Sequence, residues 1–313
     1  MKPVLIALDI GATKTIIGRV VGERVKAERR LATVKLFRKG GNINPLVTEV
    51  RKFWKPNTQA IAVGFAGAVS GDRIMSAPNF SSDLIPKRFA LGRLLADNFN
   101  VPVRVMNDAE CFTMGEASFG AARHRRRVVG ITIGSGVGGG IVIDGAPYRG
   151  AHSLAGEFGH LPFPSADFLC GCGQPGHLET ILSGPGLVRL YAMAGGREGK
   201  GDEIESRARR GDPAARQSLA VLKEALVHLL LTVLVVWDPD IIVIGGGVSK
   251  ISSLLVAARR LTRQRLGFRP LRRVPIVPSL LHDHSVLLGA ASLSLSFLSK
   301  KERVKRLSFL RAG

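Results

Sequence analysis

The chain has 313 residues, 45% of them hydrophobic and 22% charged, which is the composition of a globular protein with room for two domains. This composition excludes a disordered or fibrous chain, and three cysteines are too few for a disulfide framework. The formal net charge is +21, and basic residues gather at 123–127, 259–273 and 300–311. No helix-turn-helix, RNA-recognition or zinc-finger pattern accompanies this charge, so we interpret these patches as solvated surface and expect no nucleic-acid partner.

The apolar runs and the cysteines indicate the cellular compartment of the protein. Residues 1–9 form a short apolar segment that ends in Asp9 and lacks a small-residue cleavage site, so they predict a first strand and not a signal peptide. No apolar run is expected to reach the roughly 18–20 residues that span a bilayer. Cys170 and Cys172 stand one residue apart, where a mutual disulfide would be strained, and Cys111 is expected in the core. We therefore expect a cytoplasmic protein without a membrane partner.

The predicted elements of the first half alternate between strands and helices. Strands are predicted at 4–9, 15–21, 25–34, 60–64 and 103–107, and helices at 45–54, 88–99 and 109–119. Tight turns join the first three strands. This alternation indicates the α/β class.

The second half begins in the same way. A strand at 128–133 leads into a glycine-rich run at 134–140, which a strand at 141–143 follows. A long helix at 213–236, a buried strand at 241–244 and a helix from Ser249 come later. A unit that opens with a hairpin thus occurs twice, and we predict two domains, 1–121 and 122–313, with the last helix able to pack back on the first.

Two glycine turns follow buried strands at corresponding places in the two halves. Their polar and glycine residues are Asp9, Gly11, Thr13 and Lys14 in the first turn, and Thr132, Gly134 and Gly136 in the second. Glycine lets the backbone approach a ligand, hydroxyl, amide and ammonium groups can bind phosphate oxygens, and a carboxylate can hold hydrated Mg²⁺. The corresponding positions of the two turns indicate that both bind the same polyphosphate.

A third glycine cluster, Gly245, Gly246 and Gly247, ends a strand before a helix, where a nucleotide can lie near the helix N-terminus. None of the three segments is a Walker A loop, because the chain contains no Gly-x-x-x-x-Gly-Lys-Ser/Thr. The run from Gly134 to Gly139 matches the spacing of a dinucleotide fingerprint. It leads into a strand and not into a helix, which excludes a Rossmann interpretation.

Two further clusters carry polar side chains. Asn107 and Asp108 end an apolar strand before a helix, and from spacing alone Asp108 is somewhat more typical of a helix cap than of a general base. Four potential metal ligands stand within 18 residues, namely His160, Cys170, Cys172 and His177. This set suits a structural, tetrahedral Zn²⁺, and the alternative is two free thiols beside two surface histidines.

Taken together, these segments resemble the ROK family of sugar kinases and repressors, from Leu5 to about Ala291. The resemblance implies a two-domain ribonuclease-H-like (actin-like ATPase) fold with a central cleft. It also implies transfer of a phosphoryl group from ATP to a hexose in the presence of Mg²⁺, with Asp108 as the catalytic base. In such kinases most of the rate comes from positioning and charge neutralisation.

The resemblance assigns further residues to the sugar. The residues implied to hold or approach its hydroxyls are Glu157, His160, Glu179, Asn107, Gly67 and Asn79. His160 would then use one ring nitrogen for zinc and the other for the sugar. The chain departs from the family pattern at three places: His177 replaces the last zinc-ligating Cys, no Leu-Pro-Trp follows Asn79, and Glu110 replaces the usual Asn.

The resemblance predicts a glucokinase, with N-acetylmannosamine, N-acetylglucosamine, fructose or allose as alternative substrates. It also predicts a homodimer. ATP and polyphosphate both stay open as the preferred donor. The alternative from another class is a sugar-responsive ROK regulator, which carries a helix-turn-helix before the first glycine turn. That turn begins here at residue 9, so we expect the kinase.

Overall fold

The computed structural model describes residues 2–164, 166–197 and 199–297, and the basic patch at 300–311 lies outside them. The described residues form two compact units. The first comprises those of Met1–Gly120 and Asp283–Gly313, and the second comprises those of Ala121–His282. The stretch that begins at Asp283 therefore returns to the unit that contains the N-terminal strand.

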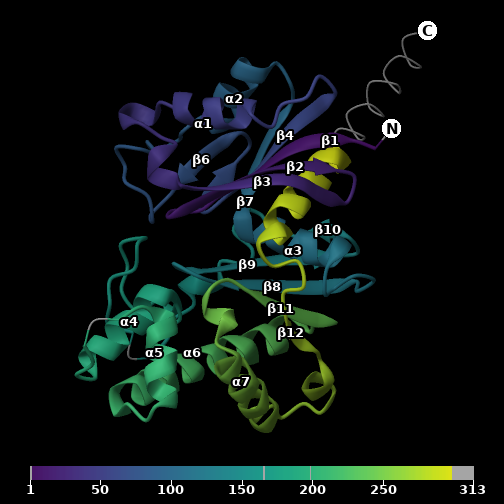
Figure 1. The fold of residues 1–313 in the computed structure, drawn as a ribbon. Coiled ribbons are helices and arrows are strands. Elements are labelled where there is room, and N and C mark those ends of the chain that lie inside the picture. Colours follow the sequence, from purple (N-terminus) through teal and green to yellow (C-terminus); the bar gives the residue numbers. More distant parts are fainter. Residues whose placement is uncertain (1, 165, 198, 298–313) are drawn as a thin grey trace. The chain divides into compact units, whose positions relative to one another are not determined.

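The first unit is built on a five-stranded sheet with the order β3-β2-β1-β4-β7 (Figure 1). Its strands are β1 (Val4–Ile10), β2 (Lys14–Val21), β3 (Arg24–Ala32), β4 (Thr58–Phe65) and β7 (Val103–Asn107). β1, β2 and β3 are antiparallel, whereas β1, β4 and β7 are parallel. β1 and β4 are almost continuous apolar runs because helices cover both faces of the sheet.

The helices of this unit pack in two pairs (Figure 1). α1 (Asn44–Arg51) and α2 (Leu91–Phe99) share a hydrophobic core with one face of the sheet. α3 (Asp108–Phe119) and the helix at 285–297 pack on the other face, against Gly64 and its neighbours. A small hairpin of β5 (Ala68–Ser70) and β6 (Arg73–Ser76) follows β4.

Glycines allow α3 and the helix at 285–297 to approach closely. A Cβ atom on Gly289 would lie 1.7 Å from the carbonyl oxygen of Cys111, and one on Gly115 would lie 2.1 Å from that of Ser285. Only hydrogen fits at either position. Cys111 is fully buried at this contact, which confirms its expected place in the core.

The second unit repeats the arrangement, with the strand order β10-β9-β8-β11-β12. Its strands are β8 (Arg127–Ile133), β9 (Val137–Ile143), β10 (Ala146–Pro147), β11 (Ile241–Gly245) and β12 (Ile276–Pro278). β8 and β9 form an antiparallel hairpin, and β8, β11 and β12 are parallel. The predicted repetition of an α/β unit that opens with a hairpin is therefore confirmed.

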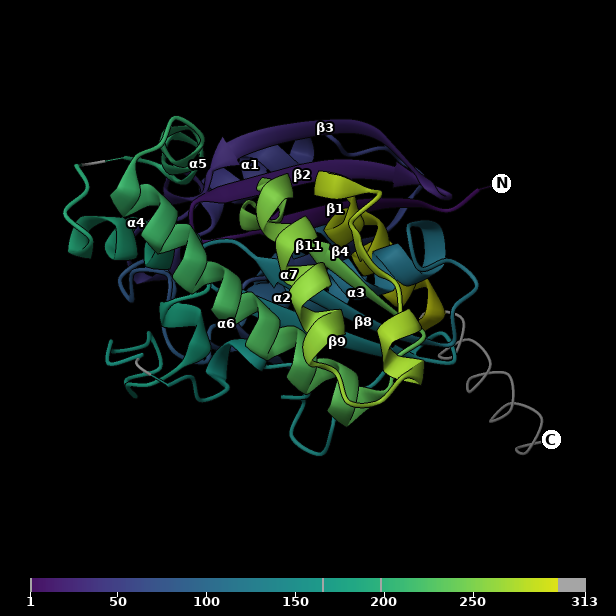
Figure 2. The same ribbon diagram turned by 90° about the horizontal axis from the view of Figure 1, so that it is seen from below.

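The helices of the second unit are α4 (Gly184–Met193), α5 (Gly201–Arg209), α6 (Pro213–Trp237) and α7 (Ser252–Arg265). α6 and α7 run side by side (Figures 1 and 2) and share a core with Ile131 and Ile244 of the sheet. Short 3-10 turns lie at Thr33–Lys35, Lys39–Gly41, Phe158–His160, Leu178–Thr180, Val248–Lys250, Pro270–Arg273 and His282–His284.

Some predicted boundaries were wrong. β9 begins at Val137, inside the glycine run, and Gly138 pairs with Thr132 of β8. Glycine forms ladder hydrogen bonds through its backbone like any other residue, so its presence did not end the strand. α7 begins at Ser252, after the turn at Val248–Lys250. α4, α5, the β5–β6 hairpin and β12 were not predicted, because each is short or has an irregular apolar pattern.

The expectation that no apolar segment is long enough to cross a membrane was also wrong. In the part of the chain that the structure describes, α6 passes that test by length and composition. Many of its residues, among them Leu226 and Leu230, are fully buried in the core of the second unit, and it contains Lys223 and Glu224. This burial is typical of a core helix in a globular domain.

Candidate active site

The predicted catalytic residues of the first unit lie at one edge of its sheet. β1, β4 and β7 are parallel neighbours, so their carboxyl ends line the same edge. Asp9 stands near the end of β1, Gly67 follows β4, and Asn107 ends β7. The side-chain amide of Asn107 donates to the carbonyl oxygen of Gly67 at 3.1 Å. The carboxyl edge of a parallel sheet is where α/β folds commonly bind ligands.

Asn107, the residue before Asp108, is the N-cap of α3. Its side-chain oxygen accepts hydrogen bonds from the backbone N–H groups of Ala109 and Glu110 at 2.9 and 3.0 Å. Asp108 is the first helical residue, and its carboxylate accepts from the N–H of Ala109 at 2.9 Å. The capping role that spacing favoured for Asp108 therefore falls to its neighbour.

Thr33 holds the first glycine turn in place. Its hydroxyl donates to the carbonyl oxygen of Gly11 at 2.7 Å and lies 2.8 Å from the hydroxyl of Thr15. Its backbone N–H donates to the carbonyl oxygen of Thr13 at 3.0 Å, and the N–H of Gly11 donates to that of Lys14 at 3.0 Å. Thr33 was not among the predicted site residues, because only the pairing of β2 with β3 brings it to the turn.

Lys14 is paired with an acidic residue that was not among the predicted site residues either. Its ammonium group lies 3.2 Å from the carboxylate of Asp283. The guanidinium of Arg30 lies 2.7 Å from the other oxygen of the same carboxylate. Lys14 and Asp283 are 269 residues apart in the chain, so no local pattern indicates their contact. A polyphosphate bound by Lys14 would compete with this carboxylate.

The charge of Asp9 depends on its neighbours. Burial raises the pKa of its carboxyl to about 7, and the carboxylates of Asp108 and Asp283 raise it as well, whereas Lys14 lowers it. A divalent cation beside these carboxylates would offset their repulsion and favour the charged form of Asp9. The residues present therefore fit the hydrated Mg²⁺ predicted at this position.

Gly67 and Asn79 lie on either side of the β5–β6 hairpin. A Cβ atom on Gly67 would lie 2.3 Å from the carbonyl oxygen of Ser76, so close backbone packing by itself accounts for this glycine. Asn79 is exposed in the turn after β6, where the ring of Phe80 stacks on Phe65 with 4.7 Å between centroids. The side chain of Asn79 makes no hydrogen bond to another described residue, so its sugar contact stays a prediction.

In the second unit, two predicted phosphate-binding segments end neighbouring parallel strands. Gly245, at the end of β11, stands opposite Thr132 of β8. The next residue, Gly246, has a φ of +87°, and a Cβ atom there would lie 2.3 Å from the carbonyl oxygen of Ile133. Both strain and crowding thus require glycine at 246. The structure brings the third glycine cluster beside the second glycine turn.

The second glycine turn has open space beside its backbone. The N–H of Gly134 donates to the carbonyl oxygen of Gly136 at 2.9 Å, and the N–H of Gly184, which begins α4, donates to that of Gly134 at 2.8 Å. A Cβ atom on Gly134 would meet no described atom within 4 Å. Packing therefore does not explain this glycine, whereas the approach of a phosphate would.

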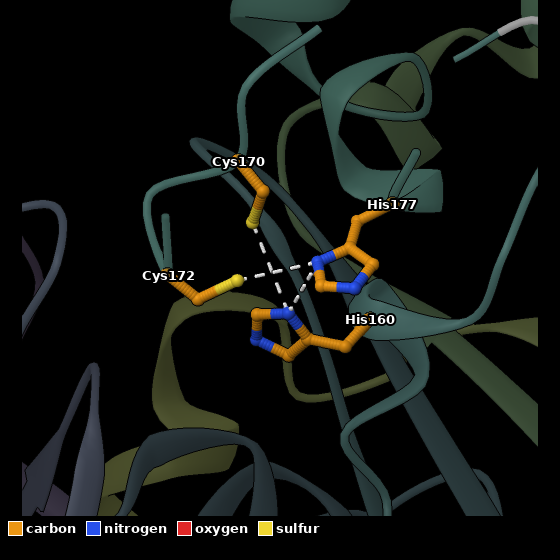
Figure 3. A group of neighbouring side chains, drawn as sticks. All are labelled: His160, Cys170, Cys172 and His177. Carbon is orange, nitrogen blue, oxygen red and sulfur yellow. Dashed lines mark hydrogen bonds between the residues drawn. The ribbon is translucent and has the colours of Figure 1, made fainter. Parts of the chain in front are cut away.

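The four predicted metal ligands converge on one point (Figure 3). The ligand atoms of His160, Cys170, Cys172 and His177 all lie within 4.8 Å of one another. The two Nδ1 atoms are 3.1 Å apart, Sγ of Cys172 is 3.3 Å from Nδ1 of His177, and Sγ of Cys170 is 3.8 Å from Nδ1 of His160. Ligands at the usual zinc distances in a tetrahedron are roughly 3.3–3.8 Å apart, so the cluster fits such an ion.

Glu179 joins the metal cluster to the start of β9. Its Oε1 accepts a hydrogen bond from the thiol of Cys170 at 2.9 Å, and its Oε2 accepts one from the N–H of Val137 at 3.3 Å. Burial raises the pKa of the Cys170 thiol to about 12, and the adjacent carboxylate contributes to the rise. A thiolate at this position would need the compensating charge of a metal ion.

The structure brings together the three residues predicted to hold sugar hydroxyls. Nδ1 of His160 faces the other metal ligands, while its Nε2 lies 3.8 Å from Oε2 of Glu157. Burial raises the pKa of Glu157; His160 opposes this rise and the carboxylate of Glu179 adds to it. The imidazole can therefore serve a metal with one nitrogen and a hydroxyl with the other.

The ROK family model matches residues 5–296 of this chain. The chain belongs to the ROK family. The predicted resemblance is thereby confirmed, and it spans both units. A solved ROK family glucokinase from Streptomyces griseus, in complex with glucose and AMPPNP, has a TM-score of 0.77 and 29% identity, and the match covers 93% of this chain and 98% of that chain. The predicted α/β, actin-like ATPase fold is confirmed by this likeness.

Curated relatives of this ROK protein include named kinases. The bifunctional enzyme NanE/NanK of Brucella melitensis is 33% identical over 299 residues, which are 95% of this chain and 55% of that protein. The chain thus spans about half the length of this relative. The N-acetylgalactosamine kinase AgaK of a Shewanella species is 35% identical over 218 residues, which are 66% of this chain and 68% of that protein.

Proposed function

We propose that this ROK protein is an ATP-dependent sugar kinase that transfers the γ-phosphoryl group to a hexose hydroxyl. The observation that carries the proposal is the position of Asp108 at the carboxyl edge of the first sheet, where it is the first residue of α3 and directly follows the capping residue Asn107. Because Asn107 supplies the cap, Asp108 need not serve that purpose. The kinase names of the relatives support the same reaction class.

In this proposal the first unit supplies the base and one phosphate turn. Asp108 accepts the proton of the sugar hydroxyl as the loose phosphoryl transition state forms. Gly11, Thr13 and Lys14 bind phosphate oxygens, and Asp9 would hold hydrated Mg²⁺. When bound, Mg²⁺ would neutralise negative charge on the phosphates.

The second unit supplies the remaining contacts to donor and acceptor. The donor contacts are assigned to Thr132, Gly134, Gly136, Gly245, Gly246 and Gly247. Glu157, His160 and Glu179 hold the sugar, together with Gly67, Asn79 and Asn107 of the first unit. His160 and the other three residues of the Cys/His cluster would hold a structural Zn²⁺, which would fix the orientation of the His160 ring. Substitutions in either unit are therefore expected to abolish turnover.

For the acceptor we propose glucose or an N-acetylated hexosamine. The Streptomyces griseus relative is named a glucokinase, and AgaK is named an N-acetylgalactosamine kinase. A panel of glucose, fructose, allose and the N-acetylated hexosamines, each with ATP and with polyphosphate, identifies substrate and donor. We further propose a cytoplasmic homodimer, for which light scattering measures the oligomeric state.

Asp108→Asn tests the proposed base. The substitution keeps the size of the side chain and leaves the Asn107 cap in place, so folding and sugar binding are expected to survive while kcat falls about 10²- to 10⁴-fold. Asp97→Asn is the matched control, because Asp97 is an exposed residue of α2 that pairs with Arg93 at 3.8 Å. Persistent activity in Asp108→Asn would refute the base. Sugar binding without any turnover by the wild type would favour the regulator.

A further inference from the structure

An arginine-lined pocket lies on the second unit, and none of its residues belongs to the proposed kinase site. The pocket has a volume of about 600 Å³. It is lined by Val256, Arg259, Arg260, Arg263 and Gln264 of α7 and by Arg272 of the 3-10 turn that follows. From sequence, this basic patch was interpreted as solvated surface.

The period of α7 gathers these side chains. The lining residues of the helix are spaced by three or four positions, which places them on one face. Leu254 and Ala258 lie on the opposite, buried face. Arg272 is oriented from the following turn, where its Nε and Nη2 donate to the carbonyl oxygen of Leu266 at 2.8 and 2.5 Å. The pocket is thus built from two elements.

Among the described residues, the arginines of this pocket have no acidic partner. Within residues 2–164, 166–197 and 199–297, no carboxylate forms an ion pair with Arg259, Arg260 or Arg263. Arg265, on the same helix but outside the pocket, pairs with Glu224 of α6 at 2.6 Å. Nε of Arg259 is buried and has no hydrogen-bond partner among the described residues. A buried donor without a partner is costly, and a bound anion would satisfy it.

Like charges make this pocket receptive to anions. Burial lowers the pKa of Arg259, and the charge of Arg263 lowers it further. An anion would relieve this repulsion. The planar guanidinium group matches phosphate oxygens with two parallel hydrogen bonds, which a point charge does not.

We propose that this pocket binds a small anion with two or more linked phosphate groups. Its volume falls within the range of small-molecule sites, roughly 300–1,000 Å³, and its four guanidinium groups match the charge of an oligophosphate. Single-stranded nucleic acid usually stacks its bases on aromatic side chains, and none of the residues lining this pocket is aromatic. These features favour a free oligophosphate over a nucleic acid.

Calorimetric titration of the full chain with tripolyphosphate, in the absence of Mg²⁺, tests this proposal. Arg260→Gln/Arg263→Gln removes two guanidinium groups from the pocket. Arg269→Gln/Arg273→Gln is the matched control, because it removes the same charge from exposed residues that flank the pocket and do not line it. Any binding of tripolyphosphate to the glycine turns is common to all three proteins. The difference in affinity between the two double variants therefore measures binding at the pocket.

The wild type and the control variant are expected to bind tripolyphosphate at the pocket at least about tenfold more tightly than Arg260→Gln/Arg263→Gln. If the affinity for tripolyphosphate fell equally in both double variants, or fell in neither, the proposed site would be refuted. Displacement of tripolyphosphate by a lower concentration of a single-stranded oligonucleotide would overturn the assignment to a small anion. Kinase turnover is expected to be unchanged in Arg260→Gln/Arg263→Gln. Failure of the pocket proposal can therefore be distinguished from failure of the proposed kinase function.

Discussion

The Nδ1 atoms of His160 and His177 lie 3.1 Å apart, with the two rings nearly perpendicular at 85°. At this distance either one proton is shared between the rings or both lone pairs face a common cation. Because His160 uses Nδ1 in this contact, its Nε2 remains on the side of Glu157. The metal cluster and the predicted sugar contacts are therefore coupled through one imidazole.

Cys172→Ser is expected to remove the metal ion and to weaken sugar binding. Loss of one thiolate from a four-ligand site lowers metal affinity, and misorientation of His160 is expected to reduce kcat/KM by about 10- to 100-fold. Elemental analysis and steady-state kinetics measure the two effects. Cys111→Ala is the control, because Cys111 is buried in the first unit and its loss should leave the metal content unchanged. Full metal content in Cys172→Ser would contradict the ligand set.

Thr33→Val is expected to weaken both the fold and ATP binding. Valine keeps the branched shape but leaves the carbonyl oxygen of Gly11 and the hydroxyl of Thr15 without this partner, so the free energy of unfolding should fall by about 1–3 kcal/mol. The KM for ATP should rise because the turn loosens. Urea denaturation and kinetics measure these changes. Thr33→Ser keeps the hydroxyl and should leave both quantities near their wild-type values; a Thr33→Ser protein as impaired as Thr33→Val would show that the hydroxyl is not the cause.

Asp9 should make stability depend on pH. Its carboxyl pKa is raised from 3.8 to about 7 in the folded protein, so between these values the folded state binds more protons than the unfolded chain. Without Mg²⁺, the free energy of unfolding should therefore fall as pH rises from about 4 to 7 and then level off. The loss is at most about 4 kcal/mol, and solvent screening reduces it.

Asp9→Asn removes this titration, so its stability relative to the wild type should grow between pH 4 and 7. Urea denaturation at several pH values measures the difference. Addition of Mg²⁺ at pH 7.5 should stabilise the wild type more than Asp9→Asn. A constant difference across the pH range would show that Asp9 keeps an ordinary pKa.

Gly246→Ala and Gly247→Ala should behave differently although they are neighbours. At Gly246 the positive φ and the 2.3 Å approach to the Ile133 carbonyl predict a loss of about 3 kcal/mol or more in the free energy of unfolding. At Gly247 the φ is −63° and no described atom lies within 4 Å of a Cβ, so folding should survive. Thermal unfolding compares the two. An unchanged KM for ATP in Gly247→Ala would argue against nucleotide contact at this cluster.

The features that could be predicted from the amino-acid sequence are those that depend on short spacings. The strand at 103–107 and its Asn107-Asp108 ending, the two glycine turns, and the four metal ligands within 18 residues are all visible in local order. The repeated hairpin opening is visible for the same reason, since strand period and turn residues are local properties. The start of β9 could not be predicted, because its glycines have no side chains and so show no alternation of apolar and polar residues.

The contacts between these segments and distant parts of the chain became visible with the three-dimensional fold. Asp283 reaches Lys14 from 269 residues away, and Thr33 reaches Gly11 through strand pairing. The assignment of the cap to Asn107, with Asp108 as the first helical residue, likewise required backbone geometry at the start of α3. Sequence spacing specifies which side chains share a strand end or a helix face. Contacts between distant segments arise from burial and hydrogen bonding in three dimensions, which no local pattern encodes.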